Sequence, residues 1–213
     1  MPSRDSDRPL PYVQERSQDT VERLLAAAEE LLAEGGAEAA TLRAIAARAR
    51  MSLGNVYRRF ADKDAVLRAV YVRFFERAAA SNREALRDGA WEGVSPEALT
   101  RAIVDGMARG YHEHRALLRA LILYARTHED PDFRRRAAAL NDAVYDRLTE
   151  LLGARGGALA PPRVRFAVRM AAATLQERIV FGEPSDDGLD VTAELSRALT
   201  LYLDAPPAHP AGS

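Results

Sequence analysis

The residues best suited to chemistry in this 213-residue chain fall into two groups. The first contains His112, Glu113, His114 and His128, which offer the imidazole nitrogens and the carboxylate that metal sites and acid–base catalysts use. His112 and His114 are two residues apart, so on a helix their side chains point to nearly opposite sides and cannot share one metal ion. His114 and His128 could meet, but the spacing supplies no third ligand.

Signatures of catalysis are missing from the rest of the sequence. It contains no HExxH motif, no phosphate-binding glycine loop and no nucleophile elbow. It also contains no cysteine, which excludes disulfides and thiolate metal sites. We therefore expect a protein that is not an enzyme, with no cofactor and no bound metal. A metal-sensing regulator stays open as an alternative because of the histidine group.

The second group is basic and lies in residues 40–80. Nine basic and three acidic side chains give this segment a charge of about +6, whereas the remainder of the chain is about −7. A basic segment on an otherwise acidic chain is typical of a protein that contacts a polyanion such as nucleic acid. A solvated helix face is the alternative interpretation of the charge alone.

The elements that must position these residues are helices. The apolar residues are mostly Ala and Leu, β-branched residues are sparse, and no convincing strand appears. Capping residues, prolines and glycines predict an all-α fold of about nine helices, near 19–34, 42–49, 52–60, 63–88, 96–114, 115–127, 131–153, 162–181 and 189–203. No run of 18 apolar residues occurs, so we expect a cytoplasmic protein without a membrane partner.

This pattern divides the chain into four parts. Residues 1–15 are rich in Pro, Arg, Asp and Ser, which predicts a disordered arm, and residues 206–213 form a similar tail. Residues 16–62 should form a three-helix domain, and residues 63–205 a larger helical domain.

Residues 41–60, TLRAIAARARMSLGNVYRRF, have the pattern of a helix-turn-helix. Ile45 and Ala49 are one turn apart, as are Val56 and Phe60, so each short helix has one narrow apolar stripe. With Val56 and Phe60 facing inward, Leu53, Gly54, Asn55, Tyr57 and Arg58 must face outward. An asparagine amide can form two hydrogen bonds with adenine, and an arginine guanidinium can form two with guanine or phosphate. These side chains point to double-stranded DNA as the partner.

The stretch Thr41–Lys63 resembles the DNA-binding domain of the TetR family of bacterial transcriptional regulators. The matching residues are Thr41, Ile45, Ala46, Ala49, Ser52, Gly54, Val56, Tyr57, Phe60 and Lys63. Lys63, the only lysine of the chain, has the position of the family's phosphate-contacting lysine. The resemblance and the residue chemistry together give the expected DNA contacts as Thr41, Arg43, Arg50, Ser52, Leu53, Gly54, Asn55, Tyr57, Arg58 and Lys63.

Arg50 departs from the family pattern, which has glycine in the turn. If the turn keeps its shape, Arg50 must adopt a positive φ at a cost of roughly 1 kcal/mol. Otherwise the turn geometry differs, and with it the angle of the second helix. Either way, Arg50 adds a positive charge beside the DNA.

The resemblance also implies that residues 63–205 bind a small-molecule effector and form a homodimer that recognises a palindromic operator, most often as a repressor. Bulky and polar residues on the Ala/Leu-rich helices suggest effector contacts at Phe75, Met107, Tyr111, Tyr124, Tyr145 and Gln176. Apolar residues of the last two helices suggest a dimer interface at Val168, Ala172, Leu175, Ile179, Leu195, Leu199 and Tyr202. Core packing within one chain is the alternative for both sets.

A helical adaptor that binds another protein through the same basic helices is a second alternative. Salt-dependent binding to duplex DNA separates it from a DNA-binding regulator.

Overall fold

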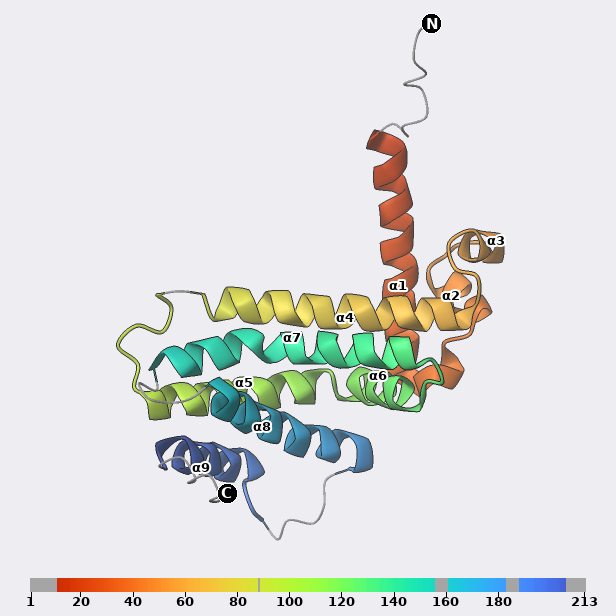
Figure 1. Cartoon of the computed structure of the whole chain (residues 1–213). Helices are drawn as coiled ribbons and strands as arrows, with labels where there is room; N and C mark the ends of the chain where they lie inside the picture. The colour runs from red at the N-terminus through yellow and green to blue at the C-terminus, as the bar shows by residue number, and fades with distance from the viewer. Residues whose placement is uncertain (1–10, 88, 156–160, 183–187, 206–213) are drawn as a thin grey trace, which may run out of the picture. The chain divides into compact units, whose positions relative to one another are not determined.

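The computed structural model of the chain describes residues 11–87, 89–155, 161–182 and 188–205, which form nine α-helices and no strand (Figure 1). The helices are α1 (Pro11–Ala39), α2 (Leu42–Arg48), α3 (Leu53–Tyr57), α4 (Lys63–Ala85), α5 (Pro96–Glu113), α6 (Arg115–Thr127), α7 (Pro131–Arg155), α8 (Pro161–Phe181) and α9 (Val191–Asp204). The all-α fold class expected from the sequence is confirmed.

The chain divides into two compact units, Met1–Tyr71 and Val72–Ser213. The boundary falls inside α4 rather than at its first residue, where the sequence placed it. Helix α1 begins at Pro11, so the expected arm is shorter than 15 residues; proline suits the first turn of a helix because its missing N–H needs no partner there. The rest of the arm, residues 1–10, and the expected tail, residues 206–213, lie outside the described residues.

Local hydrogen bonds set the helix ends in the first unit. Helix α1 loses its helical geometry at the expected glycine pair, where Gly36 has φ 67° and ψ −162°, a conformation open only to glycine. The hydroxyl of Thr41 caps α2 by accepting the N–H of Ala44 at 3.1 Å. Apolar side chains such as Leu24, Ile45 and Val56 are fully buried between these helices.

Two arginines join α1 to α2. Arg48 donates to the carboxylates of Glu30 at 3.0 Å and of Glu34 at 2.7 Å. The hydrogen bond between Arg48 and Glu34 lowers the pKa of the Glu34 carboxyl. Arg23 donates to the carbonyl oxygen of Ala49, at the end of α2, at 2.9 Å. These ion pairs lie at the surface and are screened by water, so they fix the angle between the helices more than they stabilise the fold.

The core of the second unit forms around α8, which packs against α5, α6, α7 and α9. Its most buried side chains include Leu99, Val104, Val164, Val168 and Leu199. The part of α4 that belongs to this unit is tied to α7 through backbone carbonyls. The Asn82 amide donates to Val144 at 2.9 Å, and Arg147 donates to Leu86 at 2.8 Å. These bonds fix one wall of the bundle.

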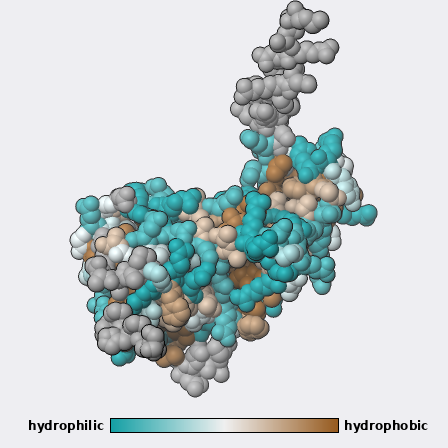
Figure 2. Space-filling view, viewed as in Figure 1, coloured by the Kyte–Doolittle hydropathy of each residue, from teal (hydrophilic) through white to brown (hydrophobic). Residues whose placement is uncertain are grey.

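The surface visible in Figure 2 is mainly hydrophilic, with several hydrophobic patches. None of the described helices combines the length and hydropathy needed to cross a bilayer.

Arg50 has φ 55°, and it is the only residue other than glycine with a positive φ in the described part of the chain. Replacing it with glycine should raise the free energy of unfolding by about 1 kcal/mol, because glycine adopts this conformation without the steric cost that a Cβ atom meets. Urea unfolding followed by circular dichroism measures the difference.

Arg50→Ala is the matched control, because alanine loses the same charge but keeps the Cβ atom. It should give no comparable gain. Equal stabilities for the glycine and alanine variants would mean that the turn is not strained at this position.

Candidate DNA-binding surface and ligand cavity

Helix α3 presents the expected outer face. Val56 is fully buried and Phe60 is 8% exposed, so these two side chains hold the helix to the core of the first unit. On the opposite side, Tyr57 is 56% exposed, Gly54 and Arg58 are exposed, and Leu53 and Asn55 are half-buried. A Cβ atom at Gly54 would meet only the Ser52 hydroxyl, at 3.9 Å, so glycine leaves open space above the backbone.

Side-chain hydrogen bonds pre-position the polar groups of this face. The Ser52 hydroxyl accepts the N–H of Asn55 at 3.3 Å and caps α3, as Thr41 caps α2. Because each hydroxyl uses an oxygen lone pair for capping, its own proton stays available to a phosphate. Arg58 donates to the side-chain oxygen of Asn55, which holds the two potential base-contacting side chains together.

Three cations flank this face without an acidic partner among the described residues. Arg43 and Arg50 are exposed, and Lys63 is half-buried at the first position of α4. In the same basic segment, Arg68 pairs with Asp64 at 2.6 Å. The charge available to a polyanion therefore gathers on the residues around the turn and at the start of α4.

The second unit contains a cavity of about 370 Å³ between α4, α5, α6 and α7. Its walls are mostly apolar and aromatic, with contributions from Phe74, Phe75, Trp91, Ile103, Met107, Leu118 and Leu148. Of the expected effector contacts, Phe75, Met107, Tyr111 and Tyr145 line it. Gln176 lies behind this wall on α8, where its amide donates to the Tyr111 hydroxyl at 3.1 Å.

Tyr124 does not line this cavity, and its expected role as an effector contact stays a prediction. Its ring packs edge-on against His128, with centroids 5.2 Å apart, and against Phe133 at 5.5 Å. The aromatic cluster at the junction of α6 and α7 explains why a bulky side chain stands there. Residue type alone could not separate this structural cluster from the cavity wall.

The cavity-lining residues that the expected effector contacts did not include are numerous, and among them are Asn82, Arg109, Gly110 and His114. A signal was present for Gly110, because a glycine inside a helix costs about 1 kcal/mol relative to alanine. A Cβ atom at this position would meet no atom within 4 Å. The glycine therefore widens a space that an ordinary helical residue would narrow.

Tyr111 and Tyr145 form a buried polar pair in the cavity wall. Their hydroxyl groups are hydrogen-bonded to each other, and Tyr145 is 7% exposed. Burial raises the pKa of the Tyr111 phenol, and it raises the pKa of the Tyr145 phenol still further. Both hydroxyls therefore keep their protons at neutral pH.

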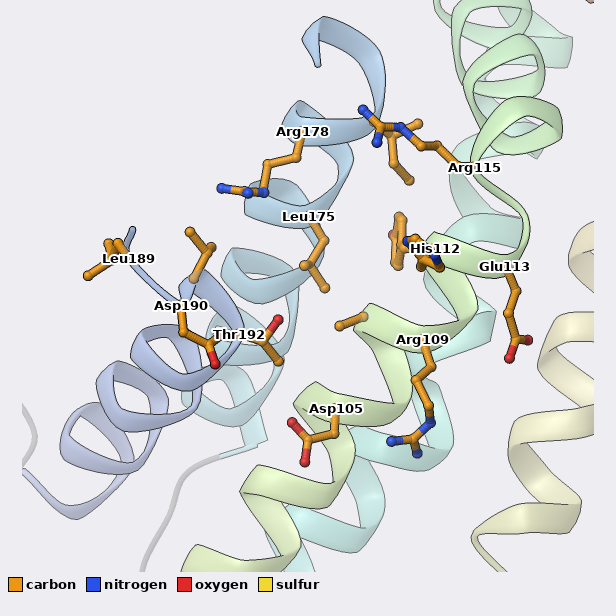
Figure 3. Close-up of a pocket in the computed structure, with 14 residues that line it drawn as sticks. Asp105, Arg109, His112, Glu113, Arg115, Leu175, Arg178, Leu189, Asp190 and Thr192 are labelled. Carbon is orange, nitrogen blue, oxygen red and sulfur yellow. The ribbon is translucent and has the colours of Figure 1, made fainter. Parts of the chain in front are cut away.

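A second hollow of about 530 Å³ lies between α5, α8 and the start of α9 (Figure 3). Figure 3 shows that it is open and that charges of both signs surround it, with Asp105 and Arg109 on α5, Arg178 on α8 and Asp190 before α9. Water solvates such charges well, so a small apolar molecule should bind less favourably here than in the more apolar cavity between α4, α5, α6 and α7. The smaller cavity is therefore the stronger candidate for a ligand site.

Six of the seven residues expected at the dimer interface are buried in the core of their own chain, and the assignment of the set to an interface stays a prediction. Val168, Ala172, Leu175, Ile179, Leu195 and Leu199 are all at most 8% exposed, and Tyr202 is half-buried. The exposed apolar residues on the outer sides of α8 and α9 are others, including Phe166 at 55% and Leu201 at 62%.

The histidines do not gather into a metal site in the described part of the chain, where no three His, Asp or Glu side chains are placed to hold an ion. His114 packs edge-on against Phe74, with centroids 5.5 Å apart. His128 packs with Tyr124, and its Nδ1 accepts the N–H of Asp130 at 3.0 Å.

Comparisons with known proteins identify both units. The family model for bacterial regulatory proteins of the tetR family matches residues 24–70, and the model for the tetracyclin repressor-like C-terminal domain matches residues 95–203. No curated protein sequence gives a significant match.

Solved structures share the fold at low sequence identity. A TetR transcriptional regulator from Rhodococcus sp. RHA1 is 22% identical, with 89% of this chain and 97% of that chain covered and a TM-score of 0.59. FadR from Bacillus subtilis, solved with stearoyl-CoA, is 20% identical, with 86% and 97% covered and a TM-score of 0.61. The multidrug binding protein EbrR, solved with ethidium, is 22% identical, with 86% and 98% covered and a TM-score of 0.62.

The helix-turn-helix unit and the helical C-terminal unit are thus recognised independently and in the expected order. The chain belongs to the TetR family of bacterial regulatory proteins, and it is a ligand-responsive, DNA-binding transcriptional regulator.

Proposed function

We propose that this regulator is a cytoplasmic repressor that binds a palindromic operator as a homodimer and leaves it when a small molecule enters the cavity. The observation that carries the proposal is the exposed face of α3, where Asn55 and Arg58 are held together beside an open Gly54 backbone. Side chains of these types recognise base edges in the major groove.

The DNA contacts divide into two kinds. Asn55 and Arg58, with Leu53 and Tyr57 beside them, contact bases, whereas Thr41, Arg43, Ser52 and Lys63 contact phosphates. Arg50 adds a phosphate contact from the turn, since its strained backbone directs an unpaired charge outward. Phosphate contacts provide affinity independently of sequence, whereas base contacts provide discrimination.

The cavity is the proposed effector site because its walls are mostly apolar and it holds a few convergent polar groups. FadR and EbrR, which share the fold, were each solved with a small molecule bound. Helix α4 contains Lys63 and, further along, the cavity residues Phe74 and Phe75. A ligand that favours one placement of this helix therefore changes the placement of a DNA-contacting residue.

The homodimer is proposed to use the outer faces of α8 and α9. Phe166 and Tyr202 pack against each other there, with ring centroids 5.6 Å apart, and the Arg163 guanidinium lies 4.8 Å from the centre of the Tyr202 ring. Together with exposed Leu201, they form an apolar area on two adjacent helices. Two copies of this area can pack as a four-helix bundle, which gives the two-fold symmetry that a palindromic site requires.

DNA binding is tested with two variants of different expected behaviour. Lys63→Ala removes a phosphate contact, so it should weaken binding to selected and random duplexes alike and reduce the slope of log K against log salt by about one. Asn55→Ala should instead relax discrimination at one base pair per half-site of the selected duplex. Fluorescence anisotropy over a salt series measures both effects.

Arg136→Ala is the matched control for charge, because Arg136 is exposed on α7 in the other unit. It should leave the salt slope unchanged. If Lys63→Ala behaves like Arg136→Ala and Asn55→Ala keeps full discrimination, the proposed DNA-binding surface is wrong.

The dimer is tested with one substitution at two exposed alanines. Ala173→Glu puts a carboxylate on α8 about two helical turns after Phe166, on the same face of the helix. Ala138→Glu puts the same group on α7. Sedimentation equilibrium should show a dimer for the parent chain and for Ala138→Glu, and at least a tenfold weaker dimer for Ala173→Glu. A monomeric parent chain, or equal behaviour of the two variants, would contradict the interface.

Leu199 is unsuitable for this test because it is 1% exposed and a charge there would unfold the chain.

A further inference from the structure

The charges around the cavity are all of one sign. Apart from the tyrosines, the only ionisable side chains among the described residues that line it are Arg109 and His114, and both are exposed bases. No carboxylate lines it to neutralise a bound cation. Moving a cation from water into an apolar site without a counter-charge is strongly unfavourable, so the cavity discriminates against positively charged ligands.

The buried tyrosine pair leaves one hydroxyl proton without an acceptor. Tyr111 and Tyr145 have two hydroxyl protons between them, and the hydrogen bond between the two hydroxyls uses one. Gln176 donates an amide N–H to the Tyr111 oxygen, and it opposes the rise in the pKa of both phenols, as a hydrogen-bond donor does. Whichever tyrosine donates to the other, one proton remains, and both tyrosines face the cavity.

A buried donor without an acceptor is costly, so this proton favours a ligand that brings an acceptor oxygen. The remaining walls are apolar and aromatic, which suits a hydrocarbon body around that single polar atom.

We propose that the ligand of this cavity is an uncharged apolar molecule whose carbonyl oxygen accepts a hydrogen bond from the Tyr111–Tyr145 pair, and that positively charged analogues are excluded. The proposal rests on the assignment of this cavity as the effector site and names the chemical class of the effector. The volume of about 370 Å³ accommodates a body of one or two small rings or an equivalent branched chain.

Three probes with one carbon ring test the class, namely cyclooctanone, cyclooctane and cyclooctylammonium. Trp91 is the only tryptophan of the chain and lines the cavity, so its fluorescence reports binding at this site without DNA. Cyclooctanone and cyclooctane should bind saturably, and cyclooctylammonium at least about thirtyfold more weakly than the ketone. Ammonium binding as tight as that of the ketone would overturn the proposal.

The double variant Tyr111→Phe/Tyr145→Phe tests the hydrogen bond. It should weaken cyclooctanone binding about tenfold and change cyclooctane binding by less than about twofold, because only the ketone uses the hydroxyl proton. Retained cyclooctane binding also demonstrates that the variant folds with its cavity intact. An unchanged ratio of ketone to hydrocarbon affinity would overturn the proposed contact, and so would loss of both.

Gly110→Leu tests the location. Since a Cβ atom there meets nothing within 4 Å, the leucine should enter the cavity and abolish binding of both neutral probes while the unfolding midpoint stays the same or rises. Persistent binding in a folded Gly110→Leu variant would place the site elsewhere. Release of DNA is measured separately, so a ketone that binds without releasing DNA contradicts the effector role and leaves the ligand class supported.

Discussion

The void kept open inside the second unit is the constraint on which the rest of the structure depends. Protein interiors pack as densely as organic crystals, and an empty volume forfeits dispersion contacts along its whole lining. A cavity of about 370 Å³ therefore needs a frame that does not collapse into it. Fully buried residues of α5, α8 and α9, such as Leu99, Val164 and Leu199, provide this frame, and the hydrogen bonds of Asn82 and Arg147 fix the position of α4 against α7.

The first unit is organised by a different constraint, because its short helices are too small to be stable alone. Capping hydroxyls, a small apolar core and arginines that bridge α1 and α2 hold them instead. Because these contacts hold α3 from its inner side, the fold does not depend on the residues of its outer face. Its side chains can therefore serve recognition, and the strain at Arg50 is compatible with a charge placed for DNA rather than for stability.

Much of this architecture followed from the sequence because it depends on neighbours along the chain. The caps at Thr41 and Ser52 were expected, and the positive φ at Arg50 was one of two alternatives, because all three arise from interactions within a few residues. Long-range placement was not accessible in the same way. Leu199 packs into the core of its own chain, and Tyr124 packs into a separate aromatic cluster. Helical periodicity identifies the apolar face of a helix, but it does not identify which other helix packs against that face.

Coupling between the cavity and the DNA-binding surface, as proposed, requires that each ligand changes the affinity of the other by the same factor. The affinity for a selected operator duplex is measured with and without a carbonyl ligand at a concentration that saturates the Trp91 signal. The affinity for the carbonyl ligand is measured with and without that duplex. Saturating ligand should weaken DNA binding at least tenfold, and DNA should weaken ligand binding by the same factor. Equal affinities in the paired titrations would show that the two sites are independent.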